Sequence, residues 1–172
     1  MTAAGEPQCV SQTRSMSGRN ELVESLIAAA QEKGLWPPAG QVLIADIERR
    51  FGVALPTDMA ALYRSMNGMP WPTRPENGWM RLWEMDSWRR VRDEPRLHDA
   101  KYSAVADAII VADHCDESWW YAAHFEPKGS GPKILLVDGL RPPKFVAENF
   151  TEFVKVALAD SMEIYPSEPS AG

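Results

Sequence analysis

Residues 47–56 read Ile-Glu-Arg-Arg-Phe-Gly-Val-Ala-Leu-Pro, and this stretch decides how the first half of the chain folds. It ends one predicted helix and begins the next. The first helix runs from about Gln41 to Phe51, because apolar residues recur there at helical spacing and a glycine follows. Pro56 favours the first turn of a second helix, since its missing N–H would have no partner there. This helix is predicted to end at Asn67-Gly68.

Upstream of this stretch, a further helix is predicted from Asn20 to Gly34, with its apolar residues on one face. Residues 1–19 and 163–172 are rich in Ser, Pro, Gly and Glu, a composition typical of flexible tails. The sequence therefore predicts one domain, which covers residues 20–162.

Downstream of Gly68 the pattern changes to short apolar runs separated by Pro and Gly, which is typical of strands. Strands are predicted at Trp79–Met85, Asp107–Asp113, Trp119–Phe125, Lys133–Val137 and Lys144–Ala147, with a short helix at Ser87–Arg92. A closing helix begins at Asn149, which resembles a capping box together with Glu152. This order of elements indicates an α+β fold, with a mainly antiparallel sheet packed with helices.

The composition is that of a globular protein and argues against several functional classes. The chain has 172 residues, a net charge of −6 and two cysteines. A low cysteine count favours a reducing, cytoplasmic location. Nucleic-acid binding is disfavoured because no long basic stretch is present. Neither an export signal nor an apolar run long enough to span a membrane is evident, so no membrane association is expected.

The charge is unevenly distributed along the chain. Residues 1–101 hold 13 basic and 13 acidic side chains, whereas residues 102–172 hold 5 basic and 11 acidic ones. The window Tyr102–Glu126 contains five acidic residues and no Lys or Arg, and a run of arginines at positions 89, 90, 92 and 96 lies just upstream. Such a window is either a solvated face or a surface that attracts a basic partner.

The stretch quoted above, together with the residues that follow it, resembles the signature of the SUKH superfamily. In that signature a Glu-containing turn ends in Gly, and Leu-Pro then leads into a helix that ends in Asn-Gly. The matching family-motif residues are Glu48, Gly52, Leu55, Pro56, Tyr63, Asn67, Gly68 and, near the C-terminus, Phe150. Backbone geometry predicts a structural role for them. The exception is Glu48, which either caps or pairs locally or faces a partner.

The resemblance implies a single SUKH-like α+β domain and a function in protein binding. Many bacterial members are immunity proteins that bind and neutralise a cognate toxin, often a nuclease. Fungal members, the Smi/Knr cell-wall regulators, are regulatory interaction proteins. Neither branch implies a common catalytic mechanism, so the chain is expected to be a non-enzymatic binding protein without a cofactor.

The densest polar cluster, residues 113–118, gives little support to a catalytic or metal site. His114 and Cys115 are adjacent, so a strand would point them to opposite faces, and no metal-binding spacing accompanies them. The same argument disfavours a Cys–His nucleophile pair, and acidic residues in a turn are usually only solvated. No glycine-rich phosphate loop or nucleophile-elbow motif is present.

The same cluster fits a protein-binding surface better, because acidic side chains steer a basic partner and aromatic rings supply buried area. The predicted partner-binding residues are Asp113, Asp116, Glu117, Trp119, Trp120 and Tyr121, with Trp71 in a proline-rich loop as a second candidate. At least one of Trp119 and Trp120 is expected in the core, since neighbours on a strand face opposite sides. The leading hypothesis is an immunity protein for a basic toxin domain. A regulatory interaction module, or a small-ligand binder or enzyme, is the alternative.

Overall fold

The structure is a computed structural model that describes residue 24 and residues 37–69, 80–126 and 131–166. Glu24 is helical, and the rest of the helix predicted from Asn20 to Gly34 lies outside the described residues. The candidate binding residue Trp71 also lies outside them.

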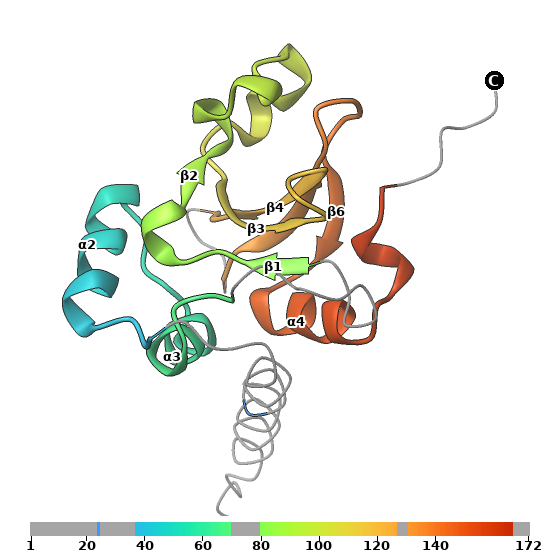
Figure 1. Ribbon diagram of the computed structural model, residues 1–172. Helices are drawn as coiled ribbons and strands as arrows, with labels where there is room; N and C mark the ends of the chain where they lie inside the picture. The colour runs from blue at the N-terminus through green and yellow to red at the C-terminus, as the bar shows by residue number, and fades with distance from the viewer. Residues whose placement is uncertain (1–23, 25–36, 70–79, 127–130, 167–172) are drawn as a thin grey trace, which may run out of the picture.

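An antiparallel sheet of six strands forms the centre of the fold (Figure 1). The strands are β1 (Met80–Leu82), β2 (Arg89–Arg90), β3 (Ile109–His114), β4 (Trp119–His124), β5 (Lys133–Val137) and β6 (Lys144–Ala147). Their order is β1-β3-β4-β5-β6, and β2 also pairs with β3. The predicted α+β single domain is confirmed, and the central strands β3 and β4 are almost entirely buried.

Three described helices pack around this sheet: α2 (Gln41–Phe51), α3 (Thr57–Ser65) and α4 (Phe150–Leu158). Helices α3 and α4 lie side by side beneath the sheet, and α2 lies at its left (Figure 1). Phe153 of α4 packs on Tyr121 of β4, with ring centroids 5.0 Å apart. Helix α4 thus covers the face of the sheet to which Tyr121 points.

The start of α4 follows the sequence prediction. Asn149 is the N-cap, and its side-chain oxygen accepts a hydrogen bond of 2.9 Å from the N–H of Glu152. The carboxylate of Glu152 pairs instead with Lys155, at 2.9 Å. The cap therefore satisfies one helix N–H, and Glu152 supports the next helical turn.

The helix predicted at Ser87–Arg92 is wrong. Between β1 and β3 the chain forms short 3-10 turns at Met85–Ser87, Val91–Asp93, Pro95–Leu97 and Ala100–Val105. The N–H of Val91 donates to the carbonyl of Ala108 at 2.9 Å, so pairing with the sheet replaces helical hydrogen bonds. Trp88 and Val91 nevertheless face the core as the spacing predicts, because both are fully buried.

The turn between α2 and α3 explains the role of Glu48. Its carboxylate accepts a hydrogen bond of 2.9 Å from the N–H of Leu55, and its carbonyl accepts one of 3.1 Å from Val53. Gly52 adopts the left-handed conformation at φ 65° that ends α2, and Pro56 is the N-cap of α3. Glu48 thus holds the helix–helix turn from inside, which is a structural role.

The Asn67-Gly68 pair joins the end of α3 to the sheet. The side chain of Asn67 accepts a hydrogen bond of 3.0 Å from the N–H of Met85, and the Tyr63 hydroxyl donates to the carbonyl of Trp83 at 3.0 Å. Gly68 has a φ of 87°, and a Cβ there would lie 2.6 Å from the backbone nitrogen of Glu84. Only glycine fits this close approach.

The C-terminal part of the described chain packs against the domain beyond residue 162, where the domain was predicted to end. A 3-10 turn spans Met162–Ile164, and Ile164 is 1% exposed. The motif residue Phe150 is also buried, at 2% exposure.

Replacing Gly68 by Ala is expected to lower the free energy of unfolding by about 3 kcal/mol, because the new Cβ meets backbone at a strained φ. The matched control is Gly40→Ala, where nothing lies within 4 Å of the new Cβ. Urea unfolding of both variants measures the difference. Equal stability of the two variants would contradict the close packing of Gly68.

Candidate partner-binding turn and its ion-pair network

The β3–β4 turn has an unusual backbone. Three consecutive residues, Cys115, Asp116 and Glu117, have φ values of 48°, 54° and 59°, a region that residues other than glycine seldom adopt. Ser118 closes the turn, because its N–H donates to the carbonyl of His114 at 3.0 Å and its hydroxyl to that of Cys115 at 2.6 Å. Such a conformation persists only when the surroundings impose it.

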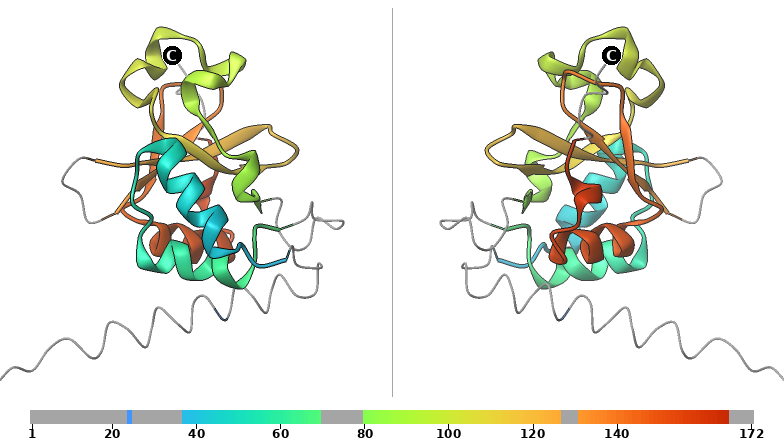
Figure 2. Two further views of the ribbon diagram at one scale, coloured as in Figure 1. Left: turned by 90° about the vertical axis from the view of Figure 1, so that its left-hand side faces the viewer. Right: turned by 90° about the vertical axis from the view of Figure 1, so that its right-hand side faces the viewer.

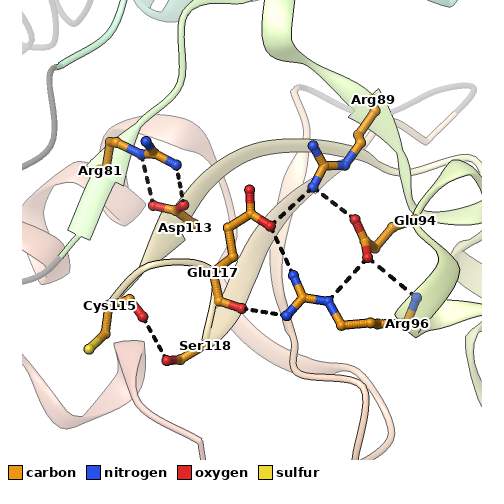
Figure 3. Close-up of polar contacts among 8 residues, drawn as sticks. All are labelled: Arg81, Arg89, Glu94, Arg96, Asp113, Cys115, Glu117 and Ser118. Carbon is orange, nitrogen blue, oxygen red and sulfur yellow. Dashed lines mark hydrogen bonds and ion pairs between the residues drawn. The ribbon is translucent and has the colours of Figure 1, made fainter.

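Arg96 holds this turn from the segment before β3 (Figure 3). One guanidinium nitrogen, Nη1, donates to the carbonyl of Glu117 at 3.1 Å, and Nη2 donates to its carboxylate at 2.9 Å. The guanidinium also lies over the ring of Trp120, 4.1 Å from the centroid. Charge, hydrogen bonding and a cation–π contact therefore all fix the turn against the sheet.

Glu94 extends the contact into a network of alternating charges (Figure 3). Its carboxylate accepts from Arg89 at 2.8 Å and from the Arg96 side chain at 3.2 Å, and Arg89 lies 3.6 Å from the Glu117 carboxylate. Burial alone would raise the pKa of Glu94, which is 6% exposed. The hydrogen bonds from Arg96 and Arg89 outweigh burial and lower this pKa.

Asp113 forms a separate pair beside the network. Its carboxylate is fully buried and accepts two hydrogen bonds from the Arg81 guanidinium, at 2.5 and 3.2 Å. Burial raises the pKa of Asp113, and the contact with Arg81 opposes that rise. The paired strands β1 and β3 bring the two side chains together, since Arg81 and Asp113 are register partners.

These contacts change the interpretation of the acidic window. Asp107 pairs with Arg90 and Arg92 at 3.0 Å each, and Glu126 pairs with Lys133 at 2.9 Å. Arg81 pairs with Asp113, and Arg96 pairs with Glu117. Among the described residues, Asp116 is therefore the one acidic residue of the window without an ion pair. Basic residues from outside the window therefore pair with most of its acidic side chains.

The structure separates the predicted partner-binding residues into two groups. Asp113, Trp120 and Tyr121 are 0%, 1% and 0% exposed, so their prediction as surface residues is corrected: they pack in the interior. Asp116 is exposed, and Glu117 and Trp119 are partly exposed. Sequence reasoning missed the role of Arg96, although the run of arginines just before the acidic window was a signal for such pairing.

An aromatic cluster lies directly beside the turn. The His114 ring stacks on Trp119 at a centroid distance of 4.2 Å and contacts the edge of Tyr165 at 5.2 Å. Trp119 donates from Nε1 to the Tyr121 hydroxyl at 3.0 Å. His114 is 2% exposed, and neither of its ring nitrogens has a hydrogen-bond partner among the described residues.

Within the described ranges, no group of three or more His, Cys, Asp or Glu side chains is placed to hold a metal ion. No helix in the same ranges is long and apolar enough to cross a membrane.

The structure is that of a small α+β domain with an antiparallel sheet. The model of the SMI1/KNR4 family (SUKH-1) matches residues 38–156, so the chain belongs to that family. The family supports a protein-interaction or immunity-type role. No curated protein matches the sequence.

Replacing Arg81 by Met is expected to destabilise the protein by about 3 kcal/mol, because the buried Asp113 carboxylate loses its counter-charge. The double variant Arg81→Met/Asp113→Leu should recover most of that loss. Lys133→Met, which breaks the exposed pair with Glu126, is the control and should change stability by less than about 1 kcal/mol. Urea unfolding of the three variants measures these changes in stability. Equal losses of stability in Arg81→Met and Lys133→Met would contradict a special role of the buried pair.

His114 is expected to make stability depend on pH. Burial lowers its pKa from 6.5 to about 4, so the unfolded chain takes up a proton at a higher pH than the folded one. Above pH 6.5, His114 is neutral in both states and does not reduce the free energy of unfolding. As the pH drops toward 4, protonation of the unfolded chain lowers this free energy by about 3 kcal/mol. His114→Phe should remove this part of the slope, measured by urea unfolding at several pH values. His98→Gln, at an exposed site, should keep it; equal slopes in both variants would contradict the assignment.

Proposed function

We propose that this protein is a cytoplasmic immunity protein, which binds and neutralises a cognate toxin without catalysing a reaction. The observation that carries the proposal is the β3–β4 turn, which combines a rare backbone conformation with exposure at its tip. Membership of the SMI1/KNR4 family supports protein binding in general, and the turn supplies a defined element for it.

The turn suits recognition because its conformation is set before the partner arrives. Arg96 contacts both the backbone and the side chain of Glu117, and Ser118 closes the turn from the other side. A loop held in this way loses little conformational entropy on binding, so more of its contact energy contributes to affinity.

The exposed residues of the turn favour a partner with basic side chains. Asp116 lies at the tip without an ion pair among the described residues, and Trp119, which follows the turn, is partly exposed. A partner Lys or Arg can pair with this carboxylate and pack on the indole. The net charge of −6 favours approach of a basic toxin domain, and the proposal includes no nucleic-acid or membrane ligand.

The test starts from the gene beside this protein's gene, where the proposal expects a toxin domain, and co-expresses that domain with this protein. Wild type should restore growth of cells that express the toxin, and Asp116→Lys should lower the affinity for that domain at least about tenfold, measured by calorimetry. Asp46→Lys makes the same charge change on the exposed face of α2 and should bind like wild type.

Each contrary outcome has a separate meaning. If Asp116→Lys binds as tightly as wild type in low salt, the turn is not the recognition element. If wild type neither binds the toxin domain nor restores growth, the immunity role is wrong, and the regulatory-module alternative then becomes the favoured one.

A further inference from the structure

The C-terminal strap, defined here as residues 161–166, lies beside the partner-binding turn. Figure 2 shows it in red, facing the viewer in the right panel. It begins directly after the last turn of α4 and contains the 3-10 turn Met162–Ile164. The strap passes the aromatic cluster at the end of β3 and the start of β4.

The sheet holds the strap by its backbone. The Tyr121 hydroxyl donates to the carbonyl of Ile164 at 2.7 Å, and the Lys144 ammonium donates to the carbonyl of Tyr165 at 2.7 Å. Every residue carries such a carbonyl. These two bonds therefore do not depend on which side chains occupy the two positions.

Two neighbouring side chains of the strap pack against the domain. Ile164 is 1% exposed and provides the aliphatic anchor. The next residue, Tyr165, places its ring against His114 and Trp119, at centroid distances of 5.2 and 6.0 Å. By contrast, Met162 is 76% exposed and contributes little packing. One aliphatic and one aromatic residue thus account for the packing of the strap.

His114 is incompletely satisfied beneath this strap. Both of its ring nitrogens are buried without a hydrogen-bond partner among the described residues, although such groups are usually paired. The strap covers His114 without supplying a donor or an acceptor to it. A different segment in the same place could hydrogen-bond to the imidazole and so gain a contact that the strap lacks.

We propose that His114, Trp119, Tyr121 and Lys144 form a binding site for a short segment of a protein partner, with an aliphatic residue followed by an aromatic one. The protein's own strap occupies this site and competes with that segment. The site is continuous with the β3–β4 turn, since His114 immediately precedes the turn and Trp119 immediately follows it. The inference rests on the proposed protein-binding function and adds the chemistry of the bound segment.

The test uses the full chain and a labelled peptide with the sequence of residues 160–166, Asp-Ser-Met-Glu-Ile-Tyr-Pro. The variant Ile164→Ser/Tyr165→Ala weakens the strap and should bind this peptide at least tenfold more tightly than wild type, measured by fluorescence anisotropy. Met162→Ala is the matched control, because it changes an exposed strap residue, and should bind like wild type. A scrambled peptide should not bind. If the folded double variant fails to bind the peptide, the proposal is overturned.

Hydrogen exchange on the unmodified chain keeps the proposal testable if the double variant does not fold. The amides of Ile164 and Tyr165 are hydrogen-bonded within the strap, to Ser161 and Met162. They should exchange at least tenfold faster than the β4 amides, because the strap opens locally. Their exchange rates should also not change when low concentrations of urea are added. If strap and β4 share one rate and one urea dependence, the strap leaves only on global unfolding and the inference is wrong.

These experiments fail separately from the test of toxin binding, because neither requires a toxin. If the strap variant does not bind the peptide but toxin binding is intact and depends on Asp116, only the strap site is wrong. If the strap variant binds the peptide but wild type does not bind the toxin, the strap site stands and the immunity role is wrong.

Discussion

A carboxylate remains charged inside a folded protein only when cations or hydrogen-bond donors compensate it, and this constraint organises the β3–β4 side of the domain. Asp113 is compensated by Arg81, and Glu94 by Arg89 and Arg96. Arg81 lies on β1, Arg89 on β2 and Arg96 in the 3-10 turn at Pro95–Leu97. The pairs therefore help to hold the part of the chain before β3 against the sheet. They also place a guanidinium over each of two tryptophan rings, so charge compensation and core packing are achieved by the same side chains.

The family motif and the candidate binding turn occupy different parts of the fold. Glu48 and Gly52 build the turn between α2 and α3, and Asn67 and Gly68 join α3 to the sheet. Among the described residues, no hydrogen bond or ion pair links these four to the β3–β4 turn. The turn that we propose for partner binding thus lies apart from the motif residues that build the scaffold, as is common for recognition loops on rigid scaffolds.

The turn and the strap adjoin each other but differ physically: the turn is preorganised, whereas the strap is proposed to be replaceable. The turn is held in a strained conformation by Arg96, so the proposed recognition element is formed before a partner arrives. The strap is held through two backbone carbonyls and one buried side chain, so a competing segment can reproduce its contacts. Preorganisation favours affinity, whereas an internal competitor lowers the affinity for segments that fit less well.

Features that depend on near neighbours were predictable from the sequence alone: the glycine stop of α2, the Asn149 cap of α4, and the central strands. Each arises from residue types within a few positions of one another. The fate of the acidic window was decided only by the tertiary structure, because its partners are distant in the chain: Arg81 lies 32 residues from Asp113, and Arg96 lies 21 from Glu117. The failed helix at Ser87–Arg92 has the same cause, since pairing with β3 supplied the hydrogen bonds that a helix would have formed internally. Local propensity determined where most helices and strands form. Long-range pairing of charges and backbone groups determined which side chains reach the surface.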